Sequence, residues 1–346
     1  MRRTDDQRQL ASAVRELATE HAGSLRAAIT TALGHDPHAW SDITAMGLPG
    51  MAVEERYGGG GGDLADLAVA IEELGQRLIP SPLFATAALA VPLLQEAGDE
   101  AAMGRWLPAI TAGQLHATAA LPANASVRAD ADNRLTGVVN RLVDGHRADL
   151  VIVAAGDGRH LYGIDTAATG WTTSVTSEPL DPTRRIATAR LDQVAATPIE
   201  AHPSALHRAL DISRTLLAAE QIGGAQRCLD MALEHAKTRR QFGRPIGTFQ
   251  AIKHLCADTY SDIECARALL EDALTSRDGF AVAAARASAG EAFVRAAERN
   301  MQIHGGISYT WEHDCHLYLR RARAGERLLG SVRDAYDEIA LSLLPL

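Results

Sequence analysis

The chain has no excess of basic residues and no long apolar segment. It contains 34 Lys and Arg and 43 Asp and Glu, which give a formal net charge of -9. This balance argues against a nucleic-acid partner, because binding a phosphate backbone needs clustered positive charge. The most apolar run, residues 83–94, is interrupted by Pro92, whereas a membrane span needs roughly 20 apolar residues. The N-terminus turns polar at once, so we expect neither a signal peptide nor a membrane span.

Cysteine is scarce and unpaired. The four residues are Cys228, Cys256, Cys265 and Cys315, and no two of them form a CxxC pair. Scattered thiols in a large acidic chain fit a reducing compartment, so we expect free cysteines and a cytoplasmic location.

The sequence shows no recognisable metal or nucleophile motif. His304, His313, Cys315 and His316 carry ligand atoms, but their spacing matches no zinc signature, so we expect packed or solvated side chains and no metal. Tyr309 and Trp311 lie between them, and we expect both rings to pack within a helical bundle.

The chain is long enough for two or three domains, and its composition changes twice. Residues 1–115 show apolar side chains at helical spacing. Residues 116–200 carry short apolar runs separated by Gly, Asp, Asn and Pro, which indicates a small β-domain. Residues 201–346 are helical again. The predicted order is therefore helical, β, helical.

The C-terminal part predicts a four-helix bundle. Its first helix runs from Pro203 to about Arg240, and at 1.5 Å per residue it is roughly 50 Å long. Helices of that length usually pack in bundles. Three more are predicted over residues 251–274, 280–304 and 316–344, with the last interrupted at Gly325 and Gly330.

Two segments of this bundle combine a cationic side chain with glycines. The first, RRQFGRPIGTFQ, spans residues 239–250, and the second, QIHGG, spans residues 302–306. Arg239 offers the fixed planar fork that suits a pyrophosphate, and Gly305 and Gly306 let a backbone approach a ligand closely. Each feature also has a structural explanation, because Arg favours a helix C-terminus and a Gly pair ends a helix.

Both segments resemble the C-terminal domain of the acyl-CoA dehydrogenase family. Residues 40–62 and 72–82 resemble its N-terminal domain, so the likeness covers nearly the whole chain. It implies a mainly α fold with a small β-domain, built as an N-terminal helical domain, a central β-domain and a C-terminal four-helix bundle. It also implies that the ADP half of FAD is held across a subunit interface by Arg239, Gln241, Phe242, Gln250, Gln302, Gly305 and Gly306.

The β-domain departs from the family where the flavin ring is held. Ala120, Leu121 and Pro122 stand in place of a Thr-Glu-Pro motif, and residues 141–145 read RLVDG in place of Trp-x-Thr-Asn-Gly. The hydroxyl and the indole that would contact the ring are absent from this sequence.

The catalytic base is also missing from its usual places. Gapless alignment from Gly305 puts the family's Glu on Leu329, and the alternative position on the long helix falls on Ser213. Leu cannot accept a proton, and a Ser without a partner base is a poor substitute. Glu326, one turn before Leu329, is the remaining candidate and needs an alignment gap.

The resemblance therefore implies a subunit of a mixed enzyme. We expect α,β-dehydrogenation of an acyl-CoA, such as a steroid side-chain thioester, with FAD as cofactor. A second acyl-CoA dehydrogenase chain would carry the base in a heterotetramer. Two alternatives stay open: a self-sufficient homotetrameric dehydrogenase or related oxidase or hydroxylase, and a purely structural subunit without cofactor contact. The electron acceptor is not predicted.

Overall fold

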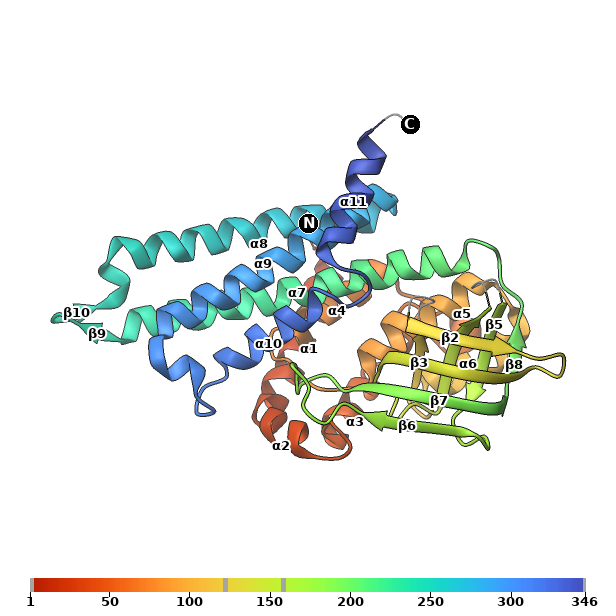
Figure 1. Cartoon of the computed structure of the whole chain (residues 1–346). Coiled ribbons are helices and arrows are strands. Elements are labelled where there is room, and N and C mark those ends of the chain that lie inside the picture. Colours follow the sequence, from red (N-terminus) through yellow and green to blue (C-terminus); the bar gives the residue numbers. More distant parts are fainter. Residues whose placement is uncertain (1–2, 121–123, 157–159, 345–346) are drawn as a thin grey trace. The chain divides into compact units, whose positions relative to one another are not determined.

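A computed structural model describes residues 3–120, 124–156 and 160–344. The chain divides into two compact units, each of which draws on several sequence segments (Figure 1). One unit comprises Met1–Ala22, Ala68–Ile79 and Arg214–Leu346, and the other comprises Gly23–Leu67 and Pro80–Ser213. The division of the sequence at residues 115 and 200 stays a prediction.

The first unit is helical apart from one small hairpin. Its helices are α1 (Asp5–Glu20), the end of α4 (Leu64–Gly75), most of α7 (Ala205–Thr238), α8 (Gln250–Ser276), α9 (Gly279–His304), α10 (Cys315–Gly325) and α11 (Val332–Leu343). The hairpin is β9 (Arg240–Gln241) with β10 (Arg244–Pro245), and the short helices are η6 (Ile246–Thr248) and η7 (Gly305–Tyr309). The helix limits lie within a few residues of the sequence prediction.

The helices α4 and α7 approach backbone to backbone at two glycines. A Cβ at Gly223 would lie 2.0 Å from the Glu72 carbonyl oxygen, and one at Gly75 would lie 2.6 Å from that of Glu220. Neither distance is compatible with a real side chain. Glycine is therefore required on both helices by their separation, because it alone has no Cβ.

Two buried carboxylates of α4 bind arginines from other helices. Glu73 accepts bonds from Arg3 and Arg15 at 2.7 and 2.9 Å, and Glu72 pairs with Arg3 and Arg267 at 2.8 and 3.0 Å. A buried carboxylate needs such partners, because an unpaired charge in the interior is costly. This network fixes α4 against α1 and α8.

The second unit combines short helices with two four-stranded sheets. Its helical elements are η1 (His21–Ser24), α2 (Leu25–Thr30), α3 (Pro37–Ala45), η2 (Leu48–Gly50), η3 (Glu55–Tyr57), the start of α4, the π-helix η4 (Phe84–Ala90), α5 (Val91–Ala97), α6 (Glu100–Thr111) and the start of α7. One sheet has the order β1-β4-β5-β8 and the other β2-β3-β7-β6. The strands are β1 (Ala117–Ala120), β2 (Ala125–Ala129), β3 (Arg134–Val143), β4 (Leu150–Ala155), β5 (His160–Asp165), β6 (Trp171–Val175), β7 (Ile186–Ala195) and β8 (Thr197–Ile199).

The two sheets share one apolar core. It includes Leu135 and Val139 of β3, Val151 and Val153 of β4, and Ile164 of β5, all buried. Among the described strands of this unit, β1 and β4 pair in parallel and the other pairs are antiparallel. The predicted fold class, mainly α with a small β-domain, is confirmed. No helix within the described ranges is both long and apolar enough to cross a membrane.

The close contact between α4 and α7 predicts opposite effects for two helical glycines. Gly223→Ala should lower the free energy of unfolding by about 1–3 kcal/mol or more, because the new methyl group overlaps the Glu72 carbonyl. Gly104→Ala, in α6, meets nothing within 4 Å and should raise stability by about 0.5–1 kcal/mol through helix propensity. Urea unfolding of the two variants and the parent measures both values. Equal stabilities would contradict the observed helix separation.

Candidate functional site

The hairpin after α7 presents an exposed aromatic ring on a strained turn. Phe242 and Gly243 lie between the paired strands β9 and β10 and have φ of 52° and 77°. Positive φ at both central residues is the type I′ turn of two-residue hairpins, which Phe rarely adopts. The Phe242 side chain is 91% exposed. Strain of this kind, on an exposed large apolar side chain, indicates a contact surface.

Arg239 has a fixed backbone and an exposed side chain. Its amide donates to the His235 carbonyl, and its own carbonyl accepts from the Ile246 amide, both at 2.8 Å. Within the part of the chain that the structure describes, no hydrogen bond or ion pair engages its guanidinium. The guanidinium is therefore available to an anion.

The helix α8 begins directly beyond the hairpin, without a side-chain cap. Its N-cap residue is Phe249, and no side chain bonds to the amides of the first turn. Such amides, at the positive end of a helix dipole, favour anions. Gln250, the first residue of α8, is exposed, with its Nε2 3.4 Å from the His254 Nε2. The Arg244 guanidinium covers the Phe249 ring at 4.3 Å.

The end of α9 exposes glycine backbone. Gly305 has φ of 69° and ψ of -145°, a conformation open to glycine and costly for other residues. A Cβ at Gly305 or Gly306 would meet nothing within 4 Å, so the backbone faces open space. Gln302, one turn earlier, is also exposed. These three residues can approach a ligand closely.

A ring stack brings the two segments to the same end of the bundle. His235 of α7 and His304 of α9 stack with ring centroids 4.2 Å apart and an interplanar angle of 27°. Burial lowers the pKa of His304 to about 4, and it also lowers the pKa of His235, so two neutral rings meet at pH 7. The hairpin, the start of α8 and the end of α9 thus lie together (Figure 1).

Two aromatic residues near this end differ from the prediction. Tyr309 and Trp311 are 76% and 57% exposed, so neither ring is buried inside the bundle as expected. Trp311 packs on the outside of α10, with its ring centroid 4.6 Å from that of His316 and 5.6 Å from the Arg320 guanidinium. Both lie between α9 and α10, outside the regular helices.

Leu329 is buried and has a left-handed backbone conformation. It is 7% exposed and has φ of 62°, and its carbonyl accepts a bond from the Arg214 Nε at 3.0 Å. The loop around it is organised by the buried guanidinium of Arg286. Burial, and then the charge of Arg214, lowers the pKa of Arg286 to about 10. Arg286 Nη2 donates to the carbonyls of Gly325, Leu328 and Gly330 at 2.8, 3.2 and 3.2 Å.

Neither other base candidate is free in the structure. The Ser213 hydroxyl is buried, and its Oγ lies 2.6 Å from the Ala88 carbonyl oxygen and 2.7 Å from that of Ala209. Glu326 is half-buried, and its Oε2 accepts a bond from the Arg323 Nη1 at 3.1 Å. Ser213 is therefore bonded to main chain, and Glu326 is engaged by a cation on its own helix.

The β-domain positions that would contact a flavin ring carry core or exposed side chains. Ala120 is buried at the end of β1, while Leu121 and Pro122 lie outside the described residues. Arg141 is exposed at a bulge of β3 with φ of 53°, and Leu142 and Val143 are buried in the core.

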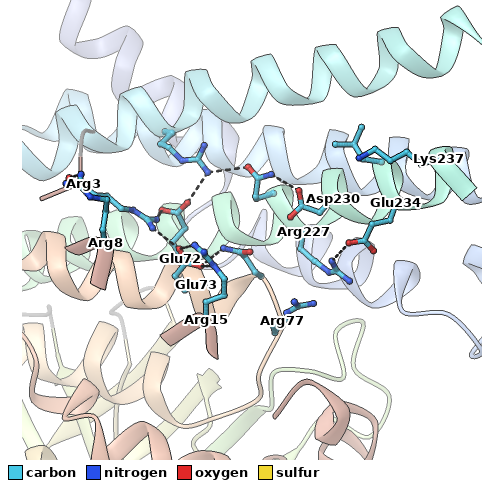
Figure 2. A pocket seen from close by; sticks show the side chains of 14 residues that line it. Arg3, Arg8, Arg15, Glu72, Glu73, Arg77, Arg227, Asp230, Glu234 and Lys237 are labelled. Atoms are coloured by element: carbon cyan, nitrogen blue, oxygen red, sulfur yellow. Dashed lines mark hydrogen bonds and ion pairs between the residues drawn. The ribbon is translucent and has the colours of Figure 1, made fainter. Parts of the chain in front are cut away.

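A charged pocket of about 890 Å³ lies along α1, α4, α7 and α8 (Figure 2). Its lining includes Glu72 and Glu73 with their arginine partners. Further along, Arg227 pairs with Glu234 at 3.3 Å. Its described lining thus consists largely of charged side chains, most of them ion-paired, whereas ligand pockets are usually lined mainly by apolar side chains. Its members come from distant segments, so no local sequence pattern indicates it.

Sequence profiles of one family match both helical parts. The acyl-CoA dehydrogenase N-terminal domain matches residues 4–114, and the acyl-CoA dehydrogenase C-terminal domain matches residues 204–340. The acyl-CoA dehydrogenase IpdE2 of Mycobacterium tuberculosis is 38% identical over 336 residues, covering 95% of each chain. Acyl-CoA dehydrogenase FadE34 of the same organism is 36% identical over 304 residues, covering 84% of this chain and 40% of FadE34.

Solved structures agree with the profiles. A structure described as the Tcur3481-Tcur3483 steroid ACAD G363A variant is 30% identical, with a TM-score of 0.89 and coverage of 97% of each chain. The matched profiles and the relatives cover most of the chain, not only residues 239–250 and 302–306. The chain therefore belongs to the acyl-CoA dehydrogenase family.

Proposed function

We propose that this chain is the ADP-binding subunit of a two-chain, FAD-dependent acyl-CoA dehydrogenase whose partner carries the base. One observation carries the proposal. The residues suited to an ADP group are exposed at one end of the bundle, whereas the usual base position holds the buried Leu329. The acyl-CoA dehydrogenase family binds FAD, and these exposed groups fit the polar half of that cofactor.

The proposed contacts follow from the chemistry of each group. Arg239 has an unengaged planar fork that matches a pyrophosphate. The first-turn amides of α8, which no side chain caps, are further donors that favour an anion, and Gln250 is the first residue of the same helix. Gln302, Gly305 and Gly306 approach from α9, where no Cβ blocks the backbone. Gln241 and Phe242, at the hairpin tip, would reach across the interface between subunits.

When bound, FAD supplies the acceptor for the hydride that leaves the acyl β-carbon. This chain's part is to bind and orient the ADP group, not to remove the α-proton. A proton acceptor must carry a lone pair within reach of the substrate. Leu329 has none, and the Ser213 Oγ is already bonded to main-chain carbonyls. The proton would therefore pass to a carboxylate of the partner chain.

The relatives support a two-chain assembly. The steroid ACAD structure is named for two components, Tcur3481 and Tcur3483. In FadE34 the segment similar to this chain covers only 40% of the protein, which leaves more than half of FadE34 outside it. We take a steroid-derived acyl-CoA as the substrate class for this chain, on the similarity to the steroid ACAD.

Exposed apolar side chains favour the same assembly. Phe242, Tyr309 and Trp311 project near the proposed ADP face and are 91%, 76% and 57% exposed. Large apolar side chains gathered on a surface mark protein interfaces. A partner that covers them would bring its own flavin seat to the ADP face.

The first test concerns Arg239. In the complex purified with its partner, Arg239→Ala should weaken FAD binding by about 10-fold or more, because charge-assisted bonds worth about 1.5–3 kcal/mol are lost. Arg239→Lys should restore only part of the affinity, since the fork is lost. The exposed neighbour Arg240 provides a matched control, and Arg240→Ala should bind FAD as the parent does. Flavin fluorescence during FAD titration measures all four proteins, and an unchanged affinity in the Arg239→Ala variant would refute the ADP contact.

The second test concerns the base. Glu326→Gln should leave the turnover of the reconstituted complex within about twofold of the parent, because the proton acceptor lies on the partner. Loss of a positioned base costs roughly 100-fold to 10,000-fold in rate, so the two outcomes are far apart. Glu298→Gln is the control, because Glu298 also pairs with Arg323. A large loss for Glu326→Gln alone, with FAD still bound, would make Glu326 catalytic and favour the self-sufficient enzyme.

A further inference from the structure

We propose that His304, His313 and Cys315 form a binding site for a late divalent transition metal, of which Zn²⁺ is the leading candidate. One ligand atom from each residue lies within 4.8 Å of the other two. His304 is the last residue of α9, Cys315 is the first of α10, and His313 lies in the connection between them. The proposal does not depend on the proposed function.

The ligand set suits zinc and its neighbours. Two imidazoles and a thiolate are ligands that these cations prefer over calcium or magnesium. The cysteine is buried and both histidines are half-buried. Zinc bonds of about 2.0–2.3 Å place tetrahedral ligands roughly 3.5 Å apart. Side-chain shifts of about 1 Å would therefore complete the site, with water in the fourth position.

The buried Asn300 already orients two of the three ligands. The His304 Nδ1 lies 3.0 Å from the Asn300 carbonyl oxygen, and as the donor there it leaves the Nε2 lone pair for a metal. The Asn300 Nδ2 donates to the Cys315 Sγ at 3.3 Å. Metal-bound histidines usually donate their second nitrogen to a carbonyl in this way. Asn300 thus fixes the orientation of the His304 ring and holds the Cys315 sulfur in place.

The third ligand must change one contact. The His313 Nδ1 accepts a bond from the Cys315 amide at 3.2 Å. Coordination through Nε2 moves the ring proton to Nδ1 and breaks this bond, and coordination through Nδ1 replaces it directly. The Cys315 thiol proton passes to solvent as the thiolate binds. Metal binding therefore loses one hydrogen bond, from the Cys315 amide to the His313 Nδ1, and gains the bonds between the ligands and the metal.

A bound metal would link the end of α9 to the start of α10. The connection that it closes begins with Gly305 and Gly306 and carries Tyr309 and Trp311. The ligand spacing matches no zinc signature, because the ligands lie across a helix end and an irregular segment. The fold brings them together through the packing of α10 on α9.

Metal titration of the full chain tests the site. After chelator treatment, the chain should bind equimolar Zn²⁺ in competition with a chromophoric chelator, and Co²⁺ should give a thiolate-to-cobalt charge-transfer band. Cys315→Ser should abolish the band, and His313→Gln should weaken Zn²⁺ binding at least 10-fold. His313 is half-buried in the connection, so its variant keeps the test valid if Cys315→Ser fails to fold.

Two matched variants control for other ligands. Cys256→Ser removes a half-buried thiol of α8 outside the cluster, and His254→Gln removes an exposed histidine of the same helix. Both should bind Zn²⁺ as the parent does. Absence of equimolar binding, or parent-like binding by folded His313→Gln and Cys315→Ser variants, would overturn the proposal. Circular dichroism confirms that each variant is folded before titration.

Discussion

The close packing of α7 against α4 is the constraint on which the first unit depends. At Gly223 and Gly75 the two helices approach so closely that a single Cβ would collide with main chain. This contact fixes the course of α7, which is 34 residues long in total. Its far end then places His235 beside His304 and begins the Arg239 hairpin. A backbone contact between two helices thus determines where the proposed ADP face forms.

The loop between α10 and α11 shows how the chain keeps its structure at the position to which the resemblance assigns the family's base. Arg286 is almost fully buried and donates to three carbonyls of that loop, while Arg214 donates to a fourth. A guanidinium suits this role because its donors are fixed in one plane. The apolar Leu329 side chain completes the packing. The loop is therefore stable without a carboxylate at this position.

Much of the fold follows from local patterns in the sequence. Apolar spacing and Gly-Gly ends predict α9 within one residue, and Gly325 and Gly330 mark the break between α10 and α11. Long-range features leave no such pattern. The salt bridges of Glu72 and Glu73, and the carbonyl contacts of Arg286, join segments far apart in the chain. The exposure of Tyr309 and Trp311 also depends on where the helix ends, not on their residue types.

The sequence predicts which residues belong to the candidate site, but not how they are arranged in space. The Arg239 and Gln302 segments are recognisable from their resemblance to a family, and their meeting through the His235–His304 stack is seen only in the fold. Their roles toward FAD remain proposals.

The flavin content of the chain with and without its partner tests the central claim most directly. We predict that the chain purified alone is nearly colourless after FAD addition and desalting, and that the purified two-chain complex carries one flavin for each pair of chains. Flavin absorbance against protein concentration gives both ratios. One tightly bound flavin per chain in the isolated protein would contradict the account, because it would require a complete flavin seat within this chain.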